Sequence, residues 1–388
     1  MNVDDTDLPD MNMSGTRVMG NGMRDRESMA ETAPQVVPSL ADLPATPLLP
    51  KQVQRFTRES LQAKPVRRFD PRETLSELWA SDGKVVIAAD IGGDKLSSGY
   101  FTVKDGVVRR TGDLLTRHGD GGDGYVDALA ELSDLARRHV LPVGLSFAGP
   151  TDGTRLLDGP NLGHFVSELR SRYGGDFANA FPQVQVANDA EAGMMAGALA
   201  AARRYPDARE VIYVINGSGL GGAVLTSDVI YATEPGHVEV VAELNPFGQR
   251  KECGLGGARH VCVEAVAASK AGVEDIWRQQ TGRHLAGERI SALYESGNRL
   301  AFDLYSSSAF LTAHVIGGMA DAFGFVKDVG QLVIVGHGGI FYVHGYRERV
   351  NAQLANAFRA DPQILYTRDF AVNACLEGAA VAALVPVG

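Results

Sequence analysis

Residues 84–95 read KVVIAADIGGDK, and this stretch decides how the folded part of the chain begins. The apolar, β-branched run at 85–89 is typical of a buried strand, and the two glycines after Asp90 indicate a tight turn. A second strand is predicted at 98–103, and the Asp-Gly pair at 105–106 predicts a hairpin. The folded body therefore opens with a strand, a glycine turn and a returning strand.

The same order of elements returns in the second half of the chain. EVIYVI at 210–215 predicts another strand, which GSGLGG at 217–222 interrupts. QLVIV at 331–335 predicts a further strand, and the glycine-rich GHGG at 336–339 follows it. Because strand, glycine turn, strand and helix occur twice in this order, we predict an α/β fold with two domains of related topology and a cleft between them.

The domain boundaries follow from the same pattern. Residues 83–188 together with 371–388 form the predicted small α/β domain, and 189–370 form the large one. Residues 1–82 precede the folded body, and we expect this extension to be largely disordered. Its first part is dominated by Met, Pro, Ser, Thr and Asp without apolar periodicity. One or two short helices are expected at 56–82.

Composition limits the classes of protein to which the chain can belong. The chain has 388 residues, enough for two domains, and its 45% hydrophobic and 22% charged residues are ordinary for a soluble globular protein. A formal net charge of -10 argues against nucleic acid as a partner, because clustered Lys and Arg hold phosphate backbones. Three cysteines fit a reducing cytoplasm better than a disulfide scaffold. Without an apolar run of membrane-spanning length, we expect no membrane segment.

Four polar motifs stand at or beside the ends of predicted strands. DIGGDK at 90–95 joins a carboxylate suited to Mg²⁺ with glycines whose N–H groups can approach phosphate, although a plain hairpin would look the same. GSGLGG at 217–222 is either a second phosphate-binding turn or a flexible one. Asn188 and Asp189 end a strand, where Asp189 either takes the proton of an attacking hydroxyl or caps the next helix. The fourth motif joins EPGH at 234–237 to residues that can bind vicinal hydroxyls or a metal, namely Cys253, His260, Cys262 and Glu264.

Taken in order, these motifs resemble the ROK family of sugar kinases and related repressors, whose fold is that of the actin-like (ribonuclease H-like) ATPases. The resemblance covers about residues 84–388. The matching segments are DIGGDK (90–95) for D-I-G-G-T-K, GPNLGH (159–164) for A/S-P-N-L-G-W, NDAEA (188–192) for N-D-A-N-A, GSGLGG (217–222) for G-T-G-I-G-G, EPGH (234–237) for E-x-G-H, CVEA (262–265) for C-x-E-A and GHGG (336–339) for G-G-G.

The resemblance implies a role for individual residues. It implies that the chain is a kinase that uses ATP and Mg²⁺, forms a homodimer, and takes Asp189 as the catalytic base. The residues that would bind substrate hydroxyls are Asn161, Asn188, Glu234, His237 and Glu264. The residues that would hold the nucleotide and its metal are Asp90, Gly92, Gly93, Asp94, Lys95, Gly217, Ser218, Gly219, Gly221, Gly338 and Gly339.

Two departures from the family's motifs bear on its cofactors. Asp94 replaces the family's Thr, and a carboxylate there should repel a triphosphate unless Mg²⁺ or Lys95 lies between them. The family's zinc motif, C-x-C-G-x-x-G-C, keeps only two cysteines, at wider spacing. The remaining candidates for zinc ligands are His237, Cys253, Cys262 and His260. We favour loss of zinc, because a structural zinc ion usually has four well-placed ligands.

The function that these observations favour is ATP-dependent phosphorylation of a hydroxyl on a hexose or a sugar-like polyol. Glucose is the default substrate, and the departures, with His164 in place of the family's Trp, leave open a C7-cyclitol such as a valiolone-type compound. An N-acyl amino sugar is a third option. The alternatives are a sugar-sensing ROK-type repressor, although residues 1–82 contain no clear helix-turn-helix, and a non-catalytic sugar-binding protein in which Asp94 marks lost use of ATP.

Overall fold

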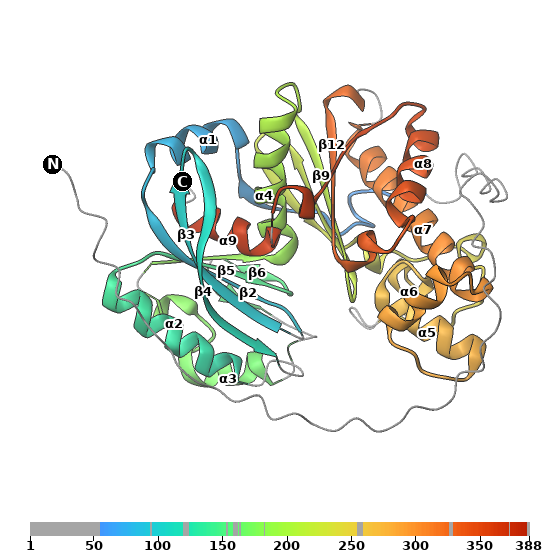
Figure 1. Cartoon of the computed structure of the whole chain (residues 1–388), viewed down its shortest axis with the longest axis horizontal. Helices are drawn as coiled ribbons and strands as arrows, with labels where there is room; N and C mark the ends of the chain where they lie inside the picture. Colours follow the sequence, from blue (N-terminus) through green and yellow to red (C-terminus); the bar gives the residue numbers. More distant parts are fainter. Residues whose placement is uncertain are drawn as a thin grey trace. The chain divides into compact units, whose positions relative to one another are not determined.

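The computed structural model describes residues 55–388 apart from Asp94, 119–123, Gly153, 158–161, Gly163, Pro182, 254–258, 326–328, Val372 and 386–388. Its strands form two mixed sheets and a small two-stranded ribbon (Figure 1). The six-stranded sheet has the order β1-β11-β10-β9-β12-β13, with β1 (Lys64–Arg68), β9 (Glu210–Asn216), β10 (Leu220–Thr226), β11 (Val229–Thr233), β12 (Leu332–His337) and β13 (Gln363–Tyr366). The five-stranded sheet has the order β4-β3-β2-β5-β8, with β2 (Val85–Ile91), β3 (Lys95–Lys104), β4 (Val107–His118), β5 (Val143–Phe147) and β8 (Val184–Asn188). The ribbon pairs β6 (Thr151–Asp152) with β7 (Arg155–Leu156).

These sheets confirm the predicted α/β class and its repeated order of elements. In each sheet a central strand pairs antiparallel with the strand that follows it, as β2 does with β3 and β9 with β10. Each also pairs parallel with a strand that returns after a helix, β5 and β12 respectively. The predicted hairpin between β3 and β4 is confirmed at Asp105 and Gly106, whose φ angles of 54° and 67° suit the mirror-image turn that hairpins favour.

The helices cover both faces of each sheet. Their bounds are α1 (Pro71–Ala80), α2 (Tyr125–His139), α3 (Phe165–Tyr173), α4 (Asp189–Arg204), α5 (Lys270–Thr281), α6 (Gly287–Glu295), α7 (Arg299–Phe323), α8 (Tyr346–Phe358) and α9 (Ala374–Leu384). Helix α4 packs on β9 and β10, and helix α9 packs on β2 and β5, so that the two helices lie between the two sheets (Figure 1). We find that no helix in the described part of the chain combines the length and the apolar character needed to cross a membrane.

Helices α4 and α9 meet backbone to backbone. A Cβ atom built on Gly378 of α9 would lie 1.7 Å from the carbonyl oxygen of Ala192 on α4. On the other side of α9, a Cβ atom on Gly144 of β5 would lie 1.8 Å from the carbonyl oxygen of Ala379. Only glycine allows such close approach, because any side chain would overlap the neighbouring backbone. The small residues of both helices thus allow the close contact at these points, while larger side chains such as Met194 and Leu376 fill the rest of the layer.

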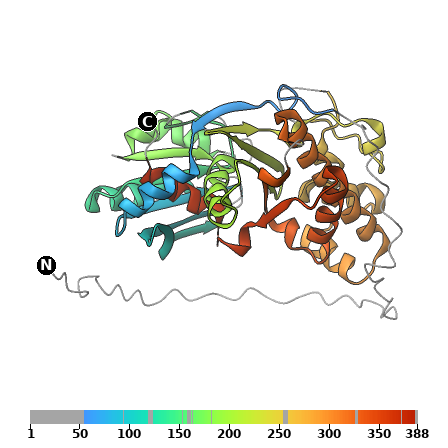
Figure 2. The same ribbon diagram turned by 90° about the horizontal axis from the view of Figure 1, so that it is seen from above.

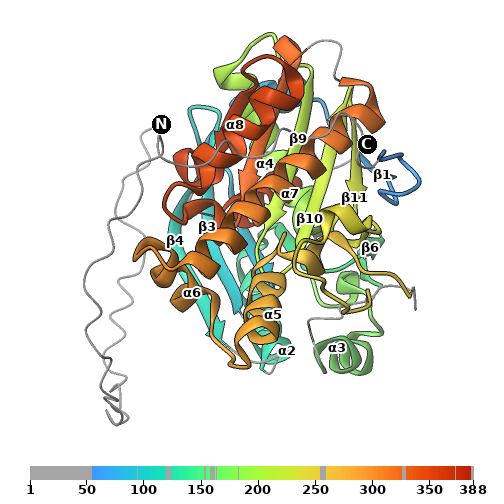
Figure 3. The same cartoon turned by 90° about the vertical axis from the view of Figure 1, so that its right-hand side faces the viewer.

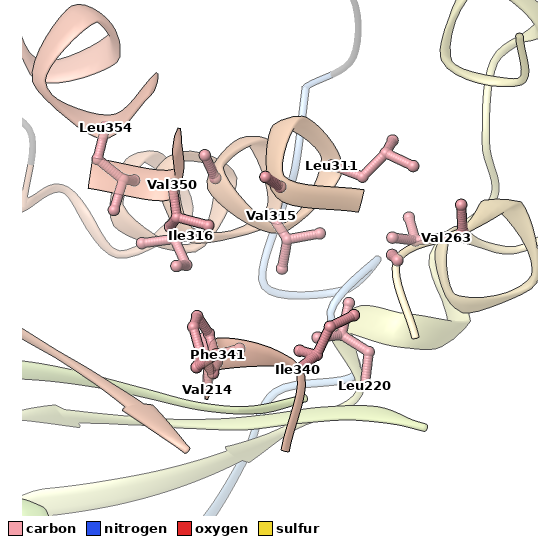
Figure 4. Close-up of a cluster of buried hydrophobic side chains, with 14 of the residues drawn as sticks. Val214, Leu220, Val263, Leu311, Val315, Ile316, Ile340, Phe341, Val350 and Leu354 are labelled. Carbon is pink, nitrogen blue, oxygen red and sulfur yellow. The ribbon is translucent and has the colours of Figure 1, made fainter. Parts of the chain in front are cut away.

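The outer face of the six-stranded sheet carries the largest apolar cluster. Val315 and Ile316 of α7 point toward Val214 of β9 and Phe341, which follows β12, while Leu311 of the same helix points toward the side where Val263 lies (Figure 4). All six side chains are buried. On the outer face of the five-stranded sheet, α2 and α3 pack against β2 and β5 through a separate apolar cluster. Each sheet therefore has its own core, while α4 and α9 fill the layer between them.

The residues before the first predicted strand contain more structure than expected. Helix α1 agrees with the one or two short helices predicted at 56–82, and Asp70 caps it by accepting hydrogen bonds from the N–H groups of Arg72 and Glu73. Strand β1 was not predicted. It pairs antiparallel with β11 and forms an edge of the six-stranded sheet (Figure 3), and the chain then passes from β1 into α1 (Figure 2). The described residues 55–82 thus contain a strand and a helix, within the segment 1–82 that we expected to be a largely disordered extension.

Candidate active site

Asp189 lies at the start of α4, directly after the end of β8. Asn188 caps the helix, because its side-chain oxygen accepts a hydrogen bond from the N–H of Ala190 at 2.9 Å. The carboxylate of Asp189 accepts a second bond from the same N–H at 2.7 Å. The side chain keeps partial access to solvent. Both side chains therefore accept the N–H of Ala190, and Asp189 is a half-buried residue.

The environment of Asp189 favours its neutral form. Burial raises the pKa of Asp189 to about 7, and the nearby charges of Asp90 and Glu234 add to the rise. The hydrogen bond from Ala190 opposes it. A carboxyl group with a pKa near neutrality is suited to accept a proton from a substrate hydroxyl.

Asp90 stands at the end of β2 and faces the same region. Ser146 Oγ donates a hydrogen bond to Asp90 Oδ1 at 2.9 Å, and Asn373 Nδ2 donates one to Oδ2 at 3.0 Å. Burial raises the pKa of Asp90, while Asn373, Ser146 and the charge of Lys95 oppose the rise. Asp90 is thus held by β5 and by the residue that caps α9, which brings together parts of the chain that are 283 residues apart.

Sequence reasoning did not single out Ser146 and Asn373. Ser146 is the polar residue in the buried strand β5, and a buried hydroxyl in an apolar strand needs a hydrogen-bond partner. Asn373 precedes an Ala-rich helix and caps it by accepting a bond from the N–H of Leu376 at 3.1 Å. Both signals mark a local structural role, but neither reveals that the partner is Asp90.

Three of the residues assigned to substrate hydroxyls lie close together. Glu264 Oε1 is 3.8 Å from His237 Nδ1, and Glu264 Oε2 accepts a hydrogen bond from the N–H of Leu220 at 3.2 Å. Burial raises the pKa of Glu234, and Glu264 adds to that rise while His237 and Lys64 oppose it. The charge of Glu234 also raises the pKa of Asp189, so electrostatic interactions link these three residues to Asp189. Asn161 lies outside the described residues.

The second glycine motif forms a shorter turn than predicted. The N–H of Gly217 donates to the carbonyl oxygen of Gly219 at 2.9 Å, and strand β10 begins at Leu220. Gly221 therefore belongs to a strand, paired with Ile215 of β9, and does not lie in the turn. The predicted turn at 217–222 was twice as long as the observed one at 217–219, because the pairing of β9 with β10 continues up to the bend.

The other glycine positions lie at the ends of central strands. The N–H of Gly92 donates to the carbonyl oxygen of Lys95 at 2.9 Å, which closes a turn between β2 and β3 that includes Gly93; Asp94 is outside the described residues. Gly338 has a φ of 110°, and a Cβ atom there would lie 1.9 Å from the carbonyl oxygen of Asn216. Gly338 therefore lies against the residue that precedes the 217–219 turn, and Gly339 begins a short 3-10 helix. Within the described residues, no hydrogen bond joins the turn at 92–95 to the one at 217–219.

The two cysteines of the reduced zinc motif meet His237. The ligand atoms of His237, Cys253 and Cys262 all lie within 4.8 Å of one another, and His237 Nδ1 is 3.3 Å from Cys253 Sγ. Burial raises the pKa of Cys262 to about 12, so the free thiol is neutral. His260 instead directs Nε2 to the carbonyl oxygen of His237, at 3.0 Å. In the described part of the chain the donors for a metal ion are therefore three, one fewer than a closed structural zinc site uses.

A third cysteine lies behind the carboxylates. Cys375 is buried in the first turn of α9, and its Sγ is 3.8 Å from the hydroxyl oxygen of Tyr213. Burial raises the pKa of both side chains, and the charges of Asp90 and Asp189 act in the same direction.

A separate cavity of about 140 Å³, lined by residues that include Asp70, Ala201 and Val211, contains none of the candidate residues.

The two sheets, the helices between them and the carboxylates at strand ends define the actin-like α/β fold. The chain belongs to the ROK family, whose model matches residues 86–385. A search of curated proteins found no match.

Solved structures agree with this assignment at the level of the fold. A ROK hexokinase from Thermus thermophilus is 22% identical, with a TM-score of 0.57, over 77% of this chain and 97% of that one. A ROK family glucokinase from Streptomyces griseus, in complex with glucose and AMPPNP, is 21% identical with a TM-score of 0.54, over 77% and 99%. A ROK family transcriptional regulator, a homolog of the E. coli MLC protein, is 16% identical with a TM-score of 0.53, over 78% and 79%.

Proposed function

We propose that this protein transfers the γ-phosphoryl group of ATP to a hydroxyl of a hexose or a sugar-like polyol, with Asp189 as the catalytic base. The observation that carries the proposal is the pair of carboxylates, Asp90 near the end of β2 and Asp189 at the start of α4, where β8 ends; β5 lies between β2 and β8 in the sheet. Their mutual effect helps to raise the pKa of Asp189 to about 7. The ROK hexokinase and glucokinase of the same fold support a sugar substrate and a nucleotide donor.

The proposed mechanism relies on positioning and on proton transfer. The substrate hydroxyl lies against Asp189, whose carboxylate takes the proton as the oxygen attacks phosphorus. The residues that bind the other hydroxyls are Asn161, Asn188, Glu234, His237 and Glu264. In the turns at 92–93 and 217–219, the N–H groups of Gly92 and Gly217 close the turns, and the remaining backbone N–H groups would face phosphate oxygens. Gly338 and Gly339 would lie on the adenosine side. The domains 83–188 with 371–388 and 189–370 would close around the substrates and exclude water.

Asp90 is the residue proposed to hold Mg²⁺, directly or through water. Its carboxylate is an oxygen ligand of the kind that Mg²⁺ prefers. The charge of Asp90 also acts on Asp189, and a cation bound between or beside the two carboxylates would compensate their repulsion. When bound, Mg²⁺ supplies charge neutralisation at the phosphate oxygens. Asp94 and Lys95 belong to the same turn, and their opposite charges would set how closely the triphosphate approaches.

The substrate is proposed at two levels. A hexose such as glucose is the general candidate. The departures from the family's motifs favour a specialised polyol, and we propose a C7-cyclitol of the valiolone type as the specific candidate, with an N-acyl amino sugar as the third. Glu234 and Glu264 near His237 offer acceptors and a donor for vicinal hydroxyls, which all three candidates carry.

A substrate panel tests the proposal. The full-length protein with Mg-ATP is incubated with hexoses, N-acyl hexosamines and C7-cyclitols, and ADP release is measured for each. We expect turnover with at least one member, and no turnover with the deoxy analogue of that member that lacks the reacting hydroxyl. Binding of Mg-ATP without transfer to any member would contradict the kinase proposal and support a sugar-binding protein.

A repressor is the competing proposal, because a ROK transcriptional regulator shares the fold. Within the described stretch 55–82 one α-helix is present, whereas a helix-turn-helix needs two. The carboxylate pair has no evident use in binding DNA. Specific retardation of an operator fragment in a gel-shift assay, reversed by a sugar, would contradict the kinase proposal.

The pH profile of the reaction should show Asp189 titrating near neutrality. Because Asp189 acts as a base only when ionised, kcat/KM should fall as the pH drops below about 7, where the carboxylate of the free enzyme takes up a proton. The measurement is initial rate against pH at low sugar concentration, with saturating Mg-ATP. A profile that stays flat down to pH of about 4, the range of an ordinary aspartate, would show that Asp189 is not the titrating base.

Removing zinc should leave the protein folded and active. His237 already contacts Cys253, and the N–H of Cys253 donates to the carbonyl oxygen of His260 at 2.8 Å, so protein contacts hold this region together. We expect protein treated with a zinc chelator and then returned to Mg²⁺ to keep its melting temperature and turnover. Stoichiometric zinc in the purified protein, with unfolding on its removal, would show that the three donors suffice.

A further inference from the structure

Strand β1 and the residues before it reach the candidate active site from outside the region that matches the ROK family. That region begins at residue 86, whereas this segment spans residues 61–68. The carbonyl oxygen of Leu61 accepts a hydrogen bond from the N–H of Glu234 at 2.9 Å. The charge of Lys64 acts on Glu234 as well. The segment therefore borders the substrate group on one side.

Arg67 extends the same segment to the helix that carries Asp189. Its Nε forms an ion pair with Glu191 Oε1, and its Nη2 donates to the carbonyl oxygen of Val186 at 3.2 Å. Both side chains are buried, with 8% of Arg67 and 5% of Glu191 exposed. Val186 lies in β8 and Glu191 lies in α4, so one guanidinium bridges the two elements on either side of Asp189.

Glu191 completes this arrangement from within α4. It stands three residues after the helix cap; burial raises its pKa, while Arg67 and the backbone N–H of Asn188 oppose the rise. Asn188 caps the helix at Ala190, and Glu191 occupies the position at which a capping box carries its acidic residue, so the two side chains lie on either side of Asp189 in the sequence. NDAEA places Glu here where the family motif N-D-A-N-A has Asn. A buried carboxylate needs a buried cation, and Arg67 supplies it.

We propose that Arg67 is a positioning residue, which fixes the turn from Val186 to Glu191 and thereby the direction in which Asp189 faces the substrate hydroxyl. The inference rests on the proposed function of Asp189. It also makes the segment before the ROK-matched region a working part of the active site. Arg67 touches no reacting atom and acts through Glu191 and the carbonyl group of Val186.

The test uses the full-length protein with four variants: Arg67→Met, Glu191→Gln, the double variant and Arg67→Lys. Arg67→Met leaves a buried carboxylate unpaired and should lower both stability and kcat. The double variant removes both charges, so its stability should return toward that of the unchanged protein. Its kcat should stay about 10- to 100-fold low, because no guanidinium then links Glu191 of α4 to the carbonyl group of Val186 in β8. KM for the sugar should change little, and Arg67→Lys should restore part of kcat.

Arg68→Met is the matched control. Arg68 is the next residue and pairs with Asp228 at 2.8 Å, but 74% of its side chain is exposed, so its loss should change neither stability nor kcat. If the double variant had the kcat of the unchanged protein, the role of Arg67 would be only to neutralise the buried charge of Glu191, and the proposal would be overturned. If Arg67→Met does not fold, the double variant alone decides the question.

A second measurement separates this inference from the proposed function. Amide hydrogen exchange of residues 189–194 needs no substrate, and it should speed up at least tenfold in the double variant but not in Arg68→Met. If no panel member is phosphorylated while exchange does speed up, the kinase proposal fails, and the proposal that Arg67 fixes the turn from Val186 to Glu191 (the Arg67 clamp) stands. Unchanged exchange would overturn the clamp whatever the activity.

Discussion

Replacing Asp189 with Asn is expected to lower kcat by about 10²- to 10⁴-fold, the range that a positioned general base contributes. Asn has the size of Asp and keeps the helix geometry, but it cannot accept the hydroxyl proton. Affinity for the sugar and for Mg-ATP should change little, because the other contacts remain. Steady-state kinetics and calorimetry on the same preparation measure the two effects separately.

The same variant should be more stable than the unchanged protein at neutral and higher pH. The pKa of Asp189 is about 7 in the folded state against 3.8 for the ordinary group, so the folded state binds more protons between these values. The free energy of unfolding of the unchanged protein must then fall as the pH rises from about 4 to 7. The accumulated loss is at most about 4 kcal/mol, since one pKa unit corresponds to about 1.36 kcal/mol. Asn, which stays neutral, avoids this loss.

The control for Asp189→Asn is Asp134→Asn, an exposed position on α2. It should change neither kcat nor stability at pH 8. A variant at 189 with full turnover would show that the base lies elsewhere. A variant that lost both activity and stability at pH 8 would indicate disruption of the helix start rather than loss of a base.

Replacing Gly378 with Ala is expected to destabilise the protein by about 3 kcal/mol or more. The new methyl group would lie 1.7 Å from the carbonyl oxygen of Ala192, and neither backbone can yield without moving α4 or α9. Overpacking of an interior costs about 1–3 kcal/mol where side chains can shift, and here the obstacle is a backbone. Denaturant unfolding followed by circular dichroism measures the loss.

Gly317→Ala provides the matched comparison within another helix. Gly317 lies inside α7, and a Cβ atom there would meet no atom within 4 Å. This change should stabilise the protein by about 0.5–1 kcal/mol, because alanine favours the helix. Equal effects of the two substitutions would show that α4 and α9 are not in backbone contact.

The central strands could be predicted because their sequences are apolar and β-branched. β2, β9 and β12 each combine such a run with a glycine turn, which gives both the strand and its end. β1 could not be predicted in this way. Its sequence KPVRR is charged and contains a proline, a composition that edge strands tolerate and that single-sequence patterns assign to loops.

The candidate site could be predicted as a set of motifs but not as a set of contacts. Asp90, Asp189 and Glu234 follow from motif order, and their electrostatic coupling agrees with that grouping. Ser146, Asn373 and Arg67 could not be found in this way, because their partners lie far along the chain. Gly221 was assigned to a turn because glycine content alone does not reveal where sheet pairing stops.

The burial of every thiol has a practical consequence for work on this protein. The chain has three cysteines, and Cys253, Cys262 and Cys375 are all buried. Electrophilic reagents attack the thiolate, which burial in apolar surroundings suppresses. Cysteines introduced at exposed helix positions, one on the side of each sheet, would therefore be the groups that take up a maleimide dye or spin label, so a pair of labels could follow the proposed closure without removal of any native cysteine.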